Sequence, residues 1–145
     1  MYLDTSYIAK LYLEEPDSSL VEALVQRHLS HSHAIRTSAL ALTEFHSILH
    51  RRVNEGGITE AQANRHASAF LAHVADGLWE LIPVSEQLLR RTAATVVAAP
   101  SGINIRSADA IHLMSAAEAG EREVWTADRH MLAAAAHFGL AGRTV

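Results

Sequence analysis

Four carboxylates, spread over most of the chain, are the side chains best suited to chemistry in this sequence. They are Asp4, Glu44, Asp109 and Asp128. If they meet in one pocket, each raises the pKa of the others, and a bound cation relieves the repulsion. Because every ligand atom would be an oxygen, Mg²⁺ and Mn²⁺ are favoured over zinc. The four acids therefore predict a metal site, provided that the fold brings them together.

Short predicted strands alternate with predicted helices along the chain. Strands are expected at 1–3, 34–37, 79–82 and 123–126, with an edge strand at 142–145. Helices are expected at 5–13, 18–29, 38–55, 59–76, 85–99, 106–119 and 128–139. Among the boundary signals are an N-cap at Asp17 or Ser18 and a capping box from Thr59 to Gln62. The alternation predicts an α/β fold with parallel strands and helices on both faces of the sheet.

The expected elements place the acids at one end of that sheet. In parallel α/β sheets the binding crevice lies beyond the carboxyl ends of the strands, where helices begin. Asp4 ends the first strand, Asp128 follows the fourth, and Asp109 lies in the first turn of its helix. These three acids meet if the first and fourth strands are neighbours. Glu44 lies about two turns into its helix. Like Asp109, it borders an apolar stripe that faces the core, where burying an unpaired carboxylate costs free energy.

Each acid also has a purely structural interpretation. Asp4 and Asp128 could be N-caps, and Asp109 could interact with a helix dipole from the first turn. For any single acid this alternative competes with a functional one. It does not account for four such acids together.

Arginines supply nearly all the basic charge, because Lys10 is the only lysine. The net charge of −4 is unusual for a protein that binds nucleic acid, although a local arginine stripe can coexist with an acidic whole. Arg106 and Arg129 flank two of the acids, and they could contact phosphate or be solvated charges at helix starts. The weaker candidates, for which surface roles are favoured, are Arg36, Arg51 and Arg52.

None of the ten histidines is assigned as a metal ligand. His46 and His50, spaced i, i+4, could share a zinc ion, but the His-Glu-x-x-His arrangement of zinc proteases is absent. His112 lies one turn beyond Asp109 and could touch the site, although packing beneath it is favoured. His31 and His33 are expected in a solvated loop.

Composition restricts the remaining possibilities. A chain of 145 residues, 49% of them hydrophobic, fits one globular domain over residues 1–145. There is no cysteine, which excludes disulfides, thiolate metal sites and cysteine nucleophiles. The amino terminus does not resemble a signal peptide, and no apolar run is long enough to span a membrane. We therefore expect a cytoplasmic protein.

Four short segments contain the acids. They are Leu3–Ser6, Ser38–Glu44, Arg106–Leu113 and Thr126–Arg129. In this order and spacing they resemble the motifs of the PIN-domain family, and most closely those of the VapC toxins of bacterial and archaeal toxin–antitoxin pairs. The resemblance runs from Tyr2 to about Leu140, and its most specific part is the Asp-Ala-Ile-His form at 109–112.

The resemblance implies a three-layer α/β/α sandwich on a mostly parallel sheet. It also implies an endoribonuclease that uses Mg²⁺ or Mn²⁺ to activate water, without a protein nucleophile, and leaves a 5′-phosphate. The family's acids fall on Asp4, Glu44 and Asp109, with the common fourth acid at Asp128. Hydroxyl positions that orient the acids or a metal-bound water match Thr5, Ser6 and Thr126. Family members usually form homodimers and are inhibited by a VapB-type antitoxin.

Three other functions are compatible with the sequence. One is a PIN-like module that binds RNA or a protein partner without cutting, although the intact set of acids argues against it. Another is a DNA nuclease on the same fold, which parallel incubation with RNA and DNA would distinguish. The third is a helical metal sensor that uses His46 and His50.

Overall fold

The sheet has five strands, and all of them are parallel. In this computed structural model, which describes residues 1–31 and 34–145, the strands are β1 (Tyr2–Leu3), β2 (Ile35–Ser38), β3 (Trp79–Ile82), β4 (Glu123–Trp125) and β5 (Ala141–Arg143). Their order is β3-β2-β1-β4-β5. Because every neighbouring pair is parallel, the carboxyl ends of all five strands lie at one edge. Strands β1 and β4 are neighbours, so the condition for the acids to meet is fulfilled.

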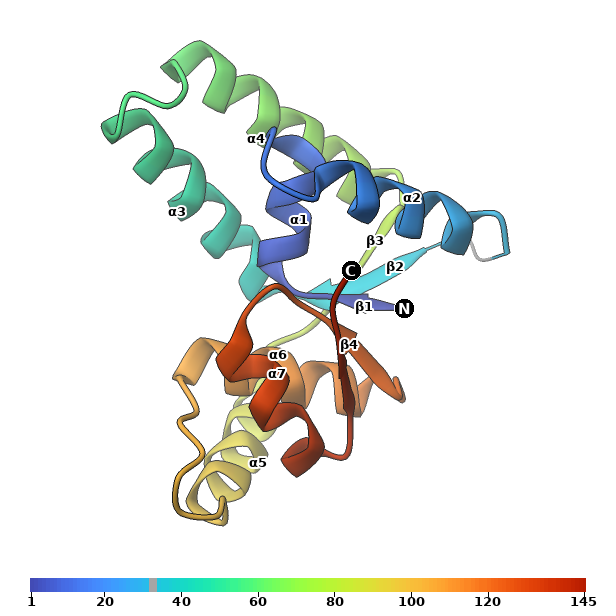
Figure 1. The fold of residues 1–145 in the computed structure, drawn as a ribbon, viewed down its shortest axis with the longest axis vertical. Coiled ribbons are helices and arrows are strands. Elements are labelled where there is room, and N and C mark those ends of the chain that lie inside the picture. Colours follow the sequence, from blue (N-terminus) through green and yellow to red (C-terminus); the bar gives the residue numbers. More distant parts are fainter. Residues whose placement is uncertain (32–33) are drawn as a thin grey trace.

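Helices cover both faces of the sheet (Figure 1). In the described part of the chain they are α1 (Thr5–Tyr12), α2 (Ser18–Leu29), α3 (Leu40–Asn54), α4 (Glu60–Ala75), α5 (Glu86–Val97), α6 (Ser107–Glu118) and α7 (Arg129–Ala134). Helices α1 to α4 lie on one side, and α5 to α7 lie on the other. The predicted three-layer α/β fold is confirmed. Within the described residues no helix is both long and apolar enough to cross a membrane.

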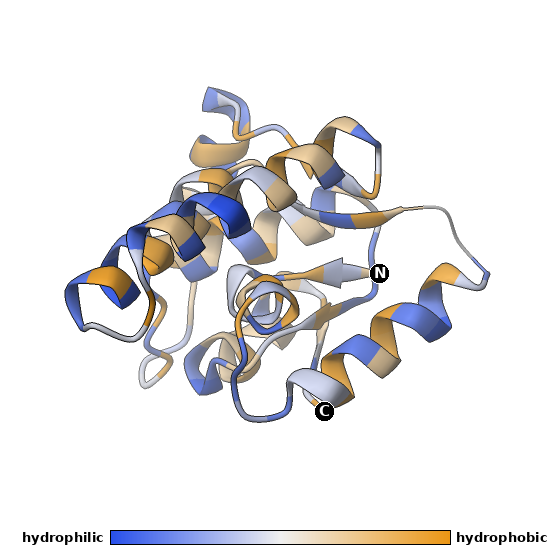
Figure 2. Ribbon diagram, turned by 90° about the horizontal axis from the view of Figure 1, so that it is seen from above, coloured by the Kyte–Doolittle hydropathy of each residue, from blue (hydrophilic) through white to orange (hydrophobic). Residues whose placement is uncertain are grey.

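The two residues of β1 anchor both helical layers. Successive side chains of a strand point to opposite faces of the sheet. Leu3 accordingly packs in one apolar cluster, with Phe45 of α3, whereas Tyr2 packs in the other, with Leu113 of α6. Most helices carry both apolar and polar residues along their length, as this arrangement requires (Figure 2). A minimal first strand is therefore enough to hold the centre of the fold.

Local signals explain most of the boundaries, with two differences. The capping box of Thr59 and Gln62 is present as predicted. Asp17 occupies the N-cap position of α2, but its side chain makes no capping hydrogen bond and its φ is +66°. The last predicted helix, 128–139, is split into α7 and a 3₁₀ turn over Ala135–Phe138, because the chain tightens before Gly139 turns it back at φ +75°.

Strand β5 lies very close to α7 and so helps to fix the position of that helix. A Cβ atom at Gly142 would lie 3.0 Å from the carbonyl oxygen of Leu132 and 3.1 Å from its Cα. Next to it, the backbone N–H of Thr126 donates to the carbonyl of Arg143 at 3.0 Å. Because Asp128 is the N-cap of α7, this close contact also positions one of the candidate acids.

Replacing Gly142 with alanine should therefore destabilise the fold. The added methyl group meets backbone, which cannot move aside as a flexible side chain would, and overpacking of this kind typically costs about 1–3 kcal/mol. Urea unfolding monitored by circular dichroism measures the loss. Ala141→Ser, an exposed change in the same strand, is the matched control. Equal stability of the two variants would show that the contact does not constrain β5.

Candidate active site

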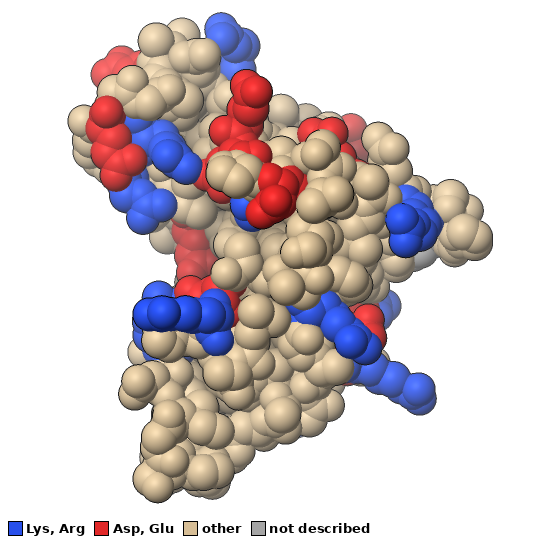
Figure 3. Space-filling model, in the orientation of Figure 1, with Lys and Arg blue, Asp and Glu red and all other residues tan. Residues whose placement is uncertain are grey.

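The structure brings all four acids to one cleft at the carboxyl ends of β1 and β4. Asp4 and Asp128 follow these strands directly, Asp109 lies in the first turn of α6, and Glu44 projects from α3. In Figure 3 acidic and basic side chains meet in a hollow between α3 and the region of α6 and α7. The lining also includes side chains that are not acidic: Thr5, Ser6, Thr43, Ser47, Ile48, Arg51, Arg106, Ala108 and His112.

Asp4 is both the N-cap of α1 and an acid of the cleft. Its Oδ1 accepts hydrogen bonds from the Ser6 hydroxyl at 2.7 Å and the Tyr7 backbone N–H at 3.2 Å, and its Oδ2 accepts one from Thr126 at 2.8 Å. Burial raises the pKa of Asp4, although His112 and the three hydrogen bonds oppose the increase. The structural and the functional interpretations of this residue are thus compatible.

Three hydroxyl groups donate hydrogen bonds to acids of the cleft. Thr5 donates a hydrogen bond to Glu44, while Ser6 accepts one from the Ala127 N–H at 3.0 Å and donates one to Asp4. Thr126 accepts from the Asp128 N–H at 2.9 Å while it donates to Asp4. These hydroxyls hold the carboxylates in fixed orientations, which restricts the geometry that any ligand in the cleft would meet.

Arg106 links Asp109 to Asp128. Its Nε donates to Asp109 Oδ2 at 2.8 Å, and its Nη2 lies 3.2 Å from Asp109 Oδ1 and also contacts Asp128 Oδ2. Asp128 in turn caps α7, because its Oδ1 accepts from the His130 N–H at 2.7 Å. Burial alone would raise the pKa of Asp128, but Arg106 and the backbone donors outweigh it and lower that pKa. From the sequence, Arg106 was either a phosphate contact or a solvated charge at a helix start, and neither alternative included this ion pair. The i, i+3 spacing of Arg106 and Asp109 was the signal that could have identified it.

Glu44 is held by a buried histidine. His112 is only 3% exposed, its Nε2 lies 2.7 Å from Glu44 Oε2, and its Nδ1 lies 2.8 Å from the Tyr2 hydroxyl. Burial would raise the pKa of Glu44, but the hydrogen bond and charge of His112, together with Thr5, lower it. His112 is buried but also lines the cleft, so it touches the site, and it connects Glu44 to the core.

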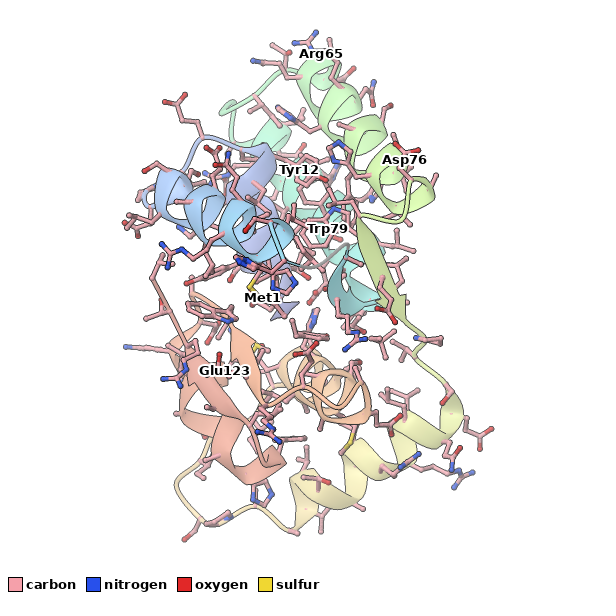
Figure 4. All side chains as sticks on the ribbon, turned by 90° about the vertical axis from the view of Figure 1, so that its right-hand side faces the viewer. Met1, Tyr12, Arg65, Asp76, Trp79 and Glu123 are labelled. Carbon is pink, nitrogen blue, oxygen red and sulfur yellow. The ribbon has the colours of Figure 1, made fainter. Side chains whose placement is uncertain are left out.

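The other arginines occupy different places. Arg51 lines the cleft, where the sequence favoured an ordinary surface position. Arg129 is exposed beside Asp128 but is not part of the lining. Arg36 pairs with Glu80 and Glu121 at the amino-terminal end of the sheet, which faces the viewer in Figure 4. Arg52 is paired with Glu15, also outside the cleft.

Among the other histidines considered above, those that the structure describes do not form a metal site. His46 and His50 are exposed, and His46 Nδ1 lies 2.6 Å from the Leu42 carbonyl, one turn back on the same helix. His31 is exposed too, whereas His33 lies outside the described residues. Throughout residues 1–31 and 34–145, no three His, Asp or Glu side chains are arranged closely enough to hold a metal ion.

The chemistry of the cleft nevertheless fits a hard divalent cation. Its acidic groups offer only oxygen donors, which Mg²⁺ and Mn²⁺ prefer. None of the ion pairs found among the described residues includes Asp4, although this carboxylate is only 7% exposed. Because burial raises the pKa of Asp4, its ionised form costs stability at neutral pH, and a neighbouring cation would relieve that cost.

Replacing His112 with leucine should raise the pKa of Glu44. The substitution fills similar space but removes the partner that opposes burial most strongly. In the native chain, the lowered pKa means that ionised Glu44 adds stability above its ordinary pKa of 4.5, and this contribution disappears as the pH falls through the lowered value. Carboxyl ¹³C NMR titration measures the change. His50→Leu, on the exposed face of α3, is the control; a Glu44 pKa that is unaltered in His112→Leu would contradict the assignment.

Comparison with solved structures identifies similar folds. The toxin VapC20 of Mycobacterium tuberculosis aligns with a TM-score of 0.70 and 19% identity, over 92% of this chain and 93% of the other. A chain from the VapBC2 structure of Rickettsia felis, determined with promoter DNA, aligns with a TM-score of 0.72 and 15% identity, over 99% of this chain and 97% of the other. No curated protein sequence matches the chain. The PIN-domain family model matches residues 1–137, and the chain therefore belongs to the PIN-domain family.

Proposed function

We propose that this protein is an endoribonuclease of the VapC kind, which hydrolyses RNA phosphodiesters with the help of Mg²⁺ or Mn²⁺. The observation that carries the proposal is the single cleft that gathers Asp4, Glu44, Asp109 and Asp128 in a PIN-domain chain. VapC20, which has a similar fold, is described as a toxin that cleaves the sarcin-ricin loop. The nuclease class follows from the family, whereas the RNA substrate and the metal are inferred for this chain.

Asp4 and Asp109 are the residues that would hold the cation, with Asp128 and Glu44 completing its surroundings directly or through water. A divalent cation bound there supplies Lewis-acid activation of water and neutralises charge on the phosphate. The chain's own contribution is orientation. Ser6, Tyr7 and Thr126 fix the carboxylate of Asp4, while Glu44 is held by Thr5 and His112, so that its carboxylate can accept a hydrogen bond from a water in the cleft.

Replacing Asp4 or Asp109 with asparagine should abolish RNA cleavage while the fold survives. Loss of an outer ligand typically costs 10–100-fold, so loss of a direct ligand should cost at least about 100-fold. Cleavage of RNA and DNA of the same sequence is measured with Mg²⁺, Mn²⁺ or EDTA. Asp76→Asn, on the surface at the end of α4 (Figure 4), is the matched control. Full activity in either cleft variant, or in EDTA, would refute the proposal, and cleavage of DNA alone would favour a DNA nuclease.

Arg51 and Arg129 are the arginines proposed to hold the RNA backbone, together with Arg106. Arg51 lines the cleft, and Arg129 is exposed next to Asp128. Their charge would act locally, since the net charge of the whole chain is −4. Each phosphate contact releases counterions, so binding should weaken steeply as salt increases.

Arg51→Ala should therefore reduce the salt dependence of RNA binding. Removing one phosphate contact lowers the slope of log K against log salt by about 0.7 for a single strand. Fluorescence anisotropy with labelled RNA, in a cleavage-deficient Asp4→Asn background, gives that slope. Arg65→Ala, on exposed α4, is the charge-matched control. Identical slopes in the two variants would remove Arg51 from the RNA-binding surface.

The partner proposals rest on similarity alone. The similar Rickettsia structure contains VapBC2 with promoter DNA, which favours a VapB-type antitoxin as the partner of this chain. A homodimer, a single domain over residues 1–145 and a cytoplasmic location complete the proposal. Co-expression with the product of a short neighbouring reading frame, followed by size-exclusion chromatography, tests the partnership; failure to form a complex would count against it.

A further inference from the structure

Arg106 occupies an unusual position for a half-exposed arginine. Its side chain is 57% exposed, yet its guanidinium bonds to two acids of the cleft, which come from different elements. Asp109, whose side chain is 12% exposed, belongs to α6, whereas Asp128 caps α7. The guanidinium thus lies between the two carboxylates and supplies the positive charge that keeps them together.

The guanidinium of Arg106 already engages the carboxylate oxygens that a divalent cation would use. Arg106 donates to both oxygens of Asp109 and contacts Oδ2 of Asp128, while Oδ1 of Asp128 is engaged by backbone N–H groups. An arginine remains charged at any pH at which the protein is folded, so the guanidinium cannot make room by losing its proton. A divalent cation that binds Asp109 and Asp128 directly therefore competes with the guanidinium for the same carboxylate oxygens.

The side chain of Arg106 is free to make that movement. It makes no capping hydrogen bond at the start of α6, and more than half of its surface meets solvent. Its bonds to Asp109 and Asp128 are charge-assisted, and a phosphate group can replace them, because guanidinium groups bind phosphate and carboxylate in the same bidentate manner. The free energy that the guanidinium loses when it leaves the two carboxylates can therefore be regained when it binds a phosphate of RNA in the cleft.

From these contacts we infer that Arg106 is an internal counter-ion that occupies the cation site of the free protein and leaves Asp109 and Asp128 when a divalent cation binds. The inference rests on the proposed metal-dependent function and adds a regulatory step to it. Arg106 stabilises the protein before the cation arrives, lowers the apparent affinity for that cation, and becomes available to phosphate afterwards. Metal binding and RNA binding would then support each other.

Mn²⁺ affinity tests the inference without an activity assay. Titration calorimetry compares the native chain with Arg106→Gln, Arg106→Lys and the control Arg65→Gln, each checked for folding by circular dichroism. Removing a competing charge-assisted contact should tighten Mn²⁺ binding about tenfold or more in Arg106→Gln. Arg106→Lys, which keeps the charge but not the bidentate geometry, should be intermediate. Arg65→Gln should bind as the native chain does.

Thermal unfolding gives a second readout. In EDTA, Arg106→Gln should melt below the native chain because Asp109 and Asp128 then repel each other, and saturating Mn²⁺ should raise its melting temperature by more than that of the native chain. Equal or weaker Mn²⁺ binding by Arg106→Gln, with binding intact in the native chain, would overturn the role of Arg106 but leave the nuclease proposal standing. If neither the native chain nor Arg106→Gln binds Mn²⁺, the role of Arg106 and the proposed metal-dependent nuclease function are both overturned.

Discussion

The repulsion between carboxylates gathered at one edge of a parallel sheet is the constraint on which the rest of the site depends. Like charges in a half-buried cleft raise one another's pKa unless something compensates them. Different groups compensate the negative charge in each part of the cluster. Neutral donors surround Asp4, the guanidinium of Arg106 bridges Asp109 and Asp128, and His112 holds Glu44. Compensation of Asp4 is the least complete, because only neutral groups bond to it and burial raises its pKa.

The cluster is coupled to the core through β1. Tyr2 packs among apolar side chains on one face of the sheet, and its hydroxyl reaches His112, which in turn reaches Glu44. On the other face, Leu3 packs against the layer that includes α3, the helix that presents Glu44. A site supported in this way is held in position before any ligand arrives, which is what a geometry-dependent reaction requires.

Much of this architecture could be predicted from the sequence because the signals are local. Asp4 and Asp128 are placed by the ends of strands and the starts of helices, and the alternation of elements predicts parallel strands whose carboxyl ends share one edge of the sheet. The order of the strands, which makes β1 and β4 neighbours, could not be read from that alternation. Contacts between distant segments could not be read in this way. Arg106 is separated from Asp128 by 22 positions in the sequence, and His112 from Glu44 by 68. Both contacts therefore depend on how the helices pack against the sheet. The 3₁₀ turn before Gly139 likewise follows from packing rather than from helix propensity.

The most direct test of a cation shared by distant acids is a crystal structure with Mn²⁺, in which anomalous scattering locates the ion. We expect a peak at about 2.1 Å from carboxylate oxygens of both Asp4 and Asp109, with the guanidinium of Arg106 withdrawn from Asp109 and Asp128. At saturating Mn²⁺, a cleft without anomalous density, or an ion bound only elsewhere on the molecule, would contradict it.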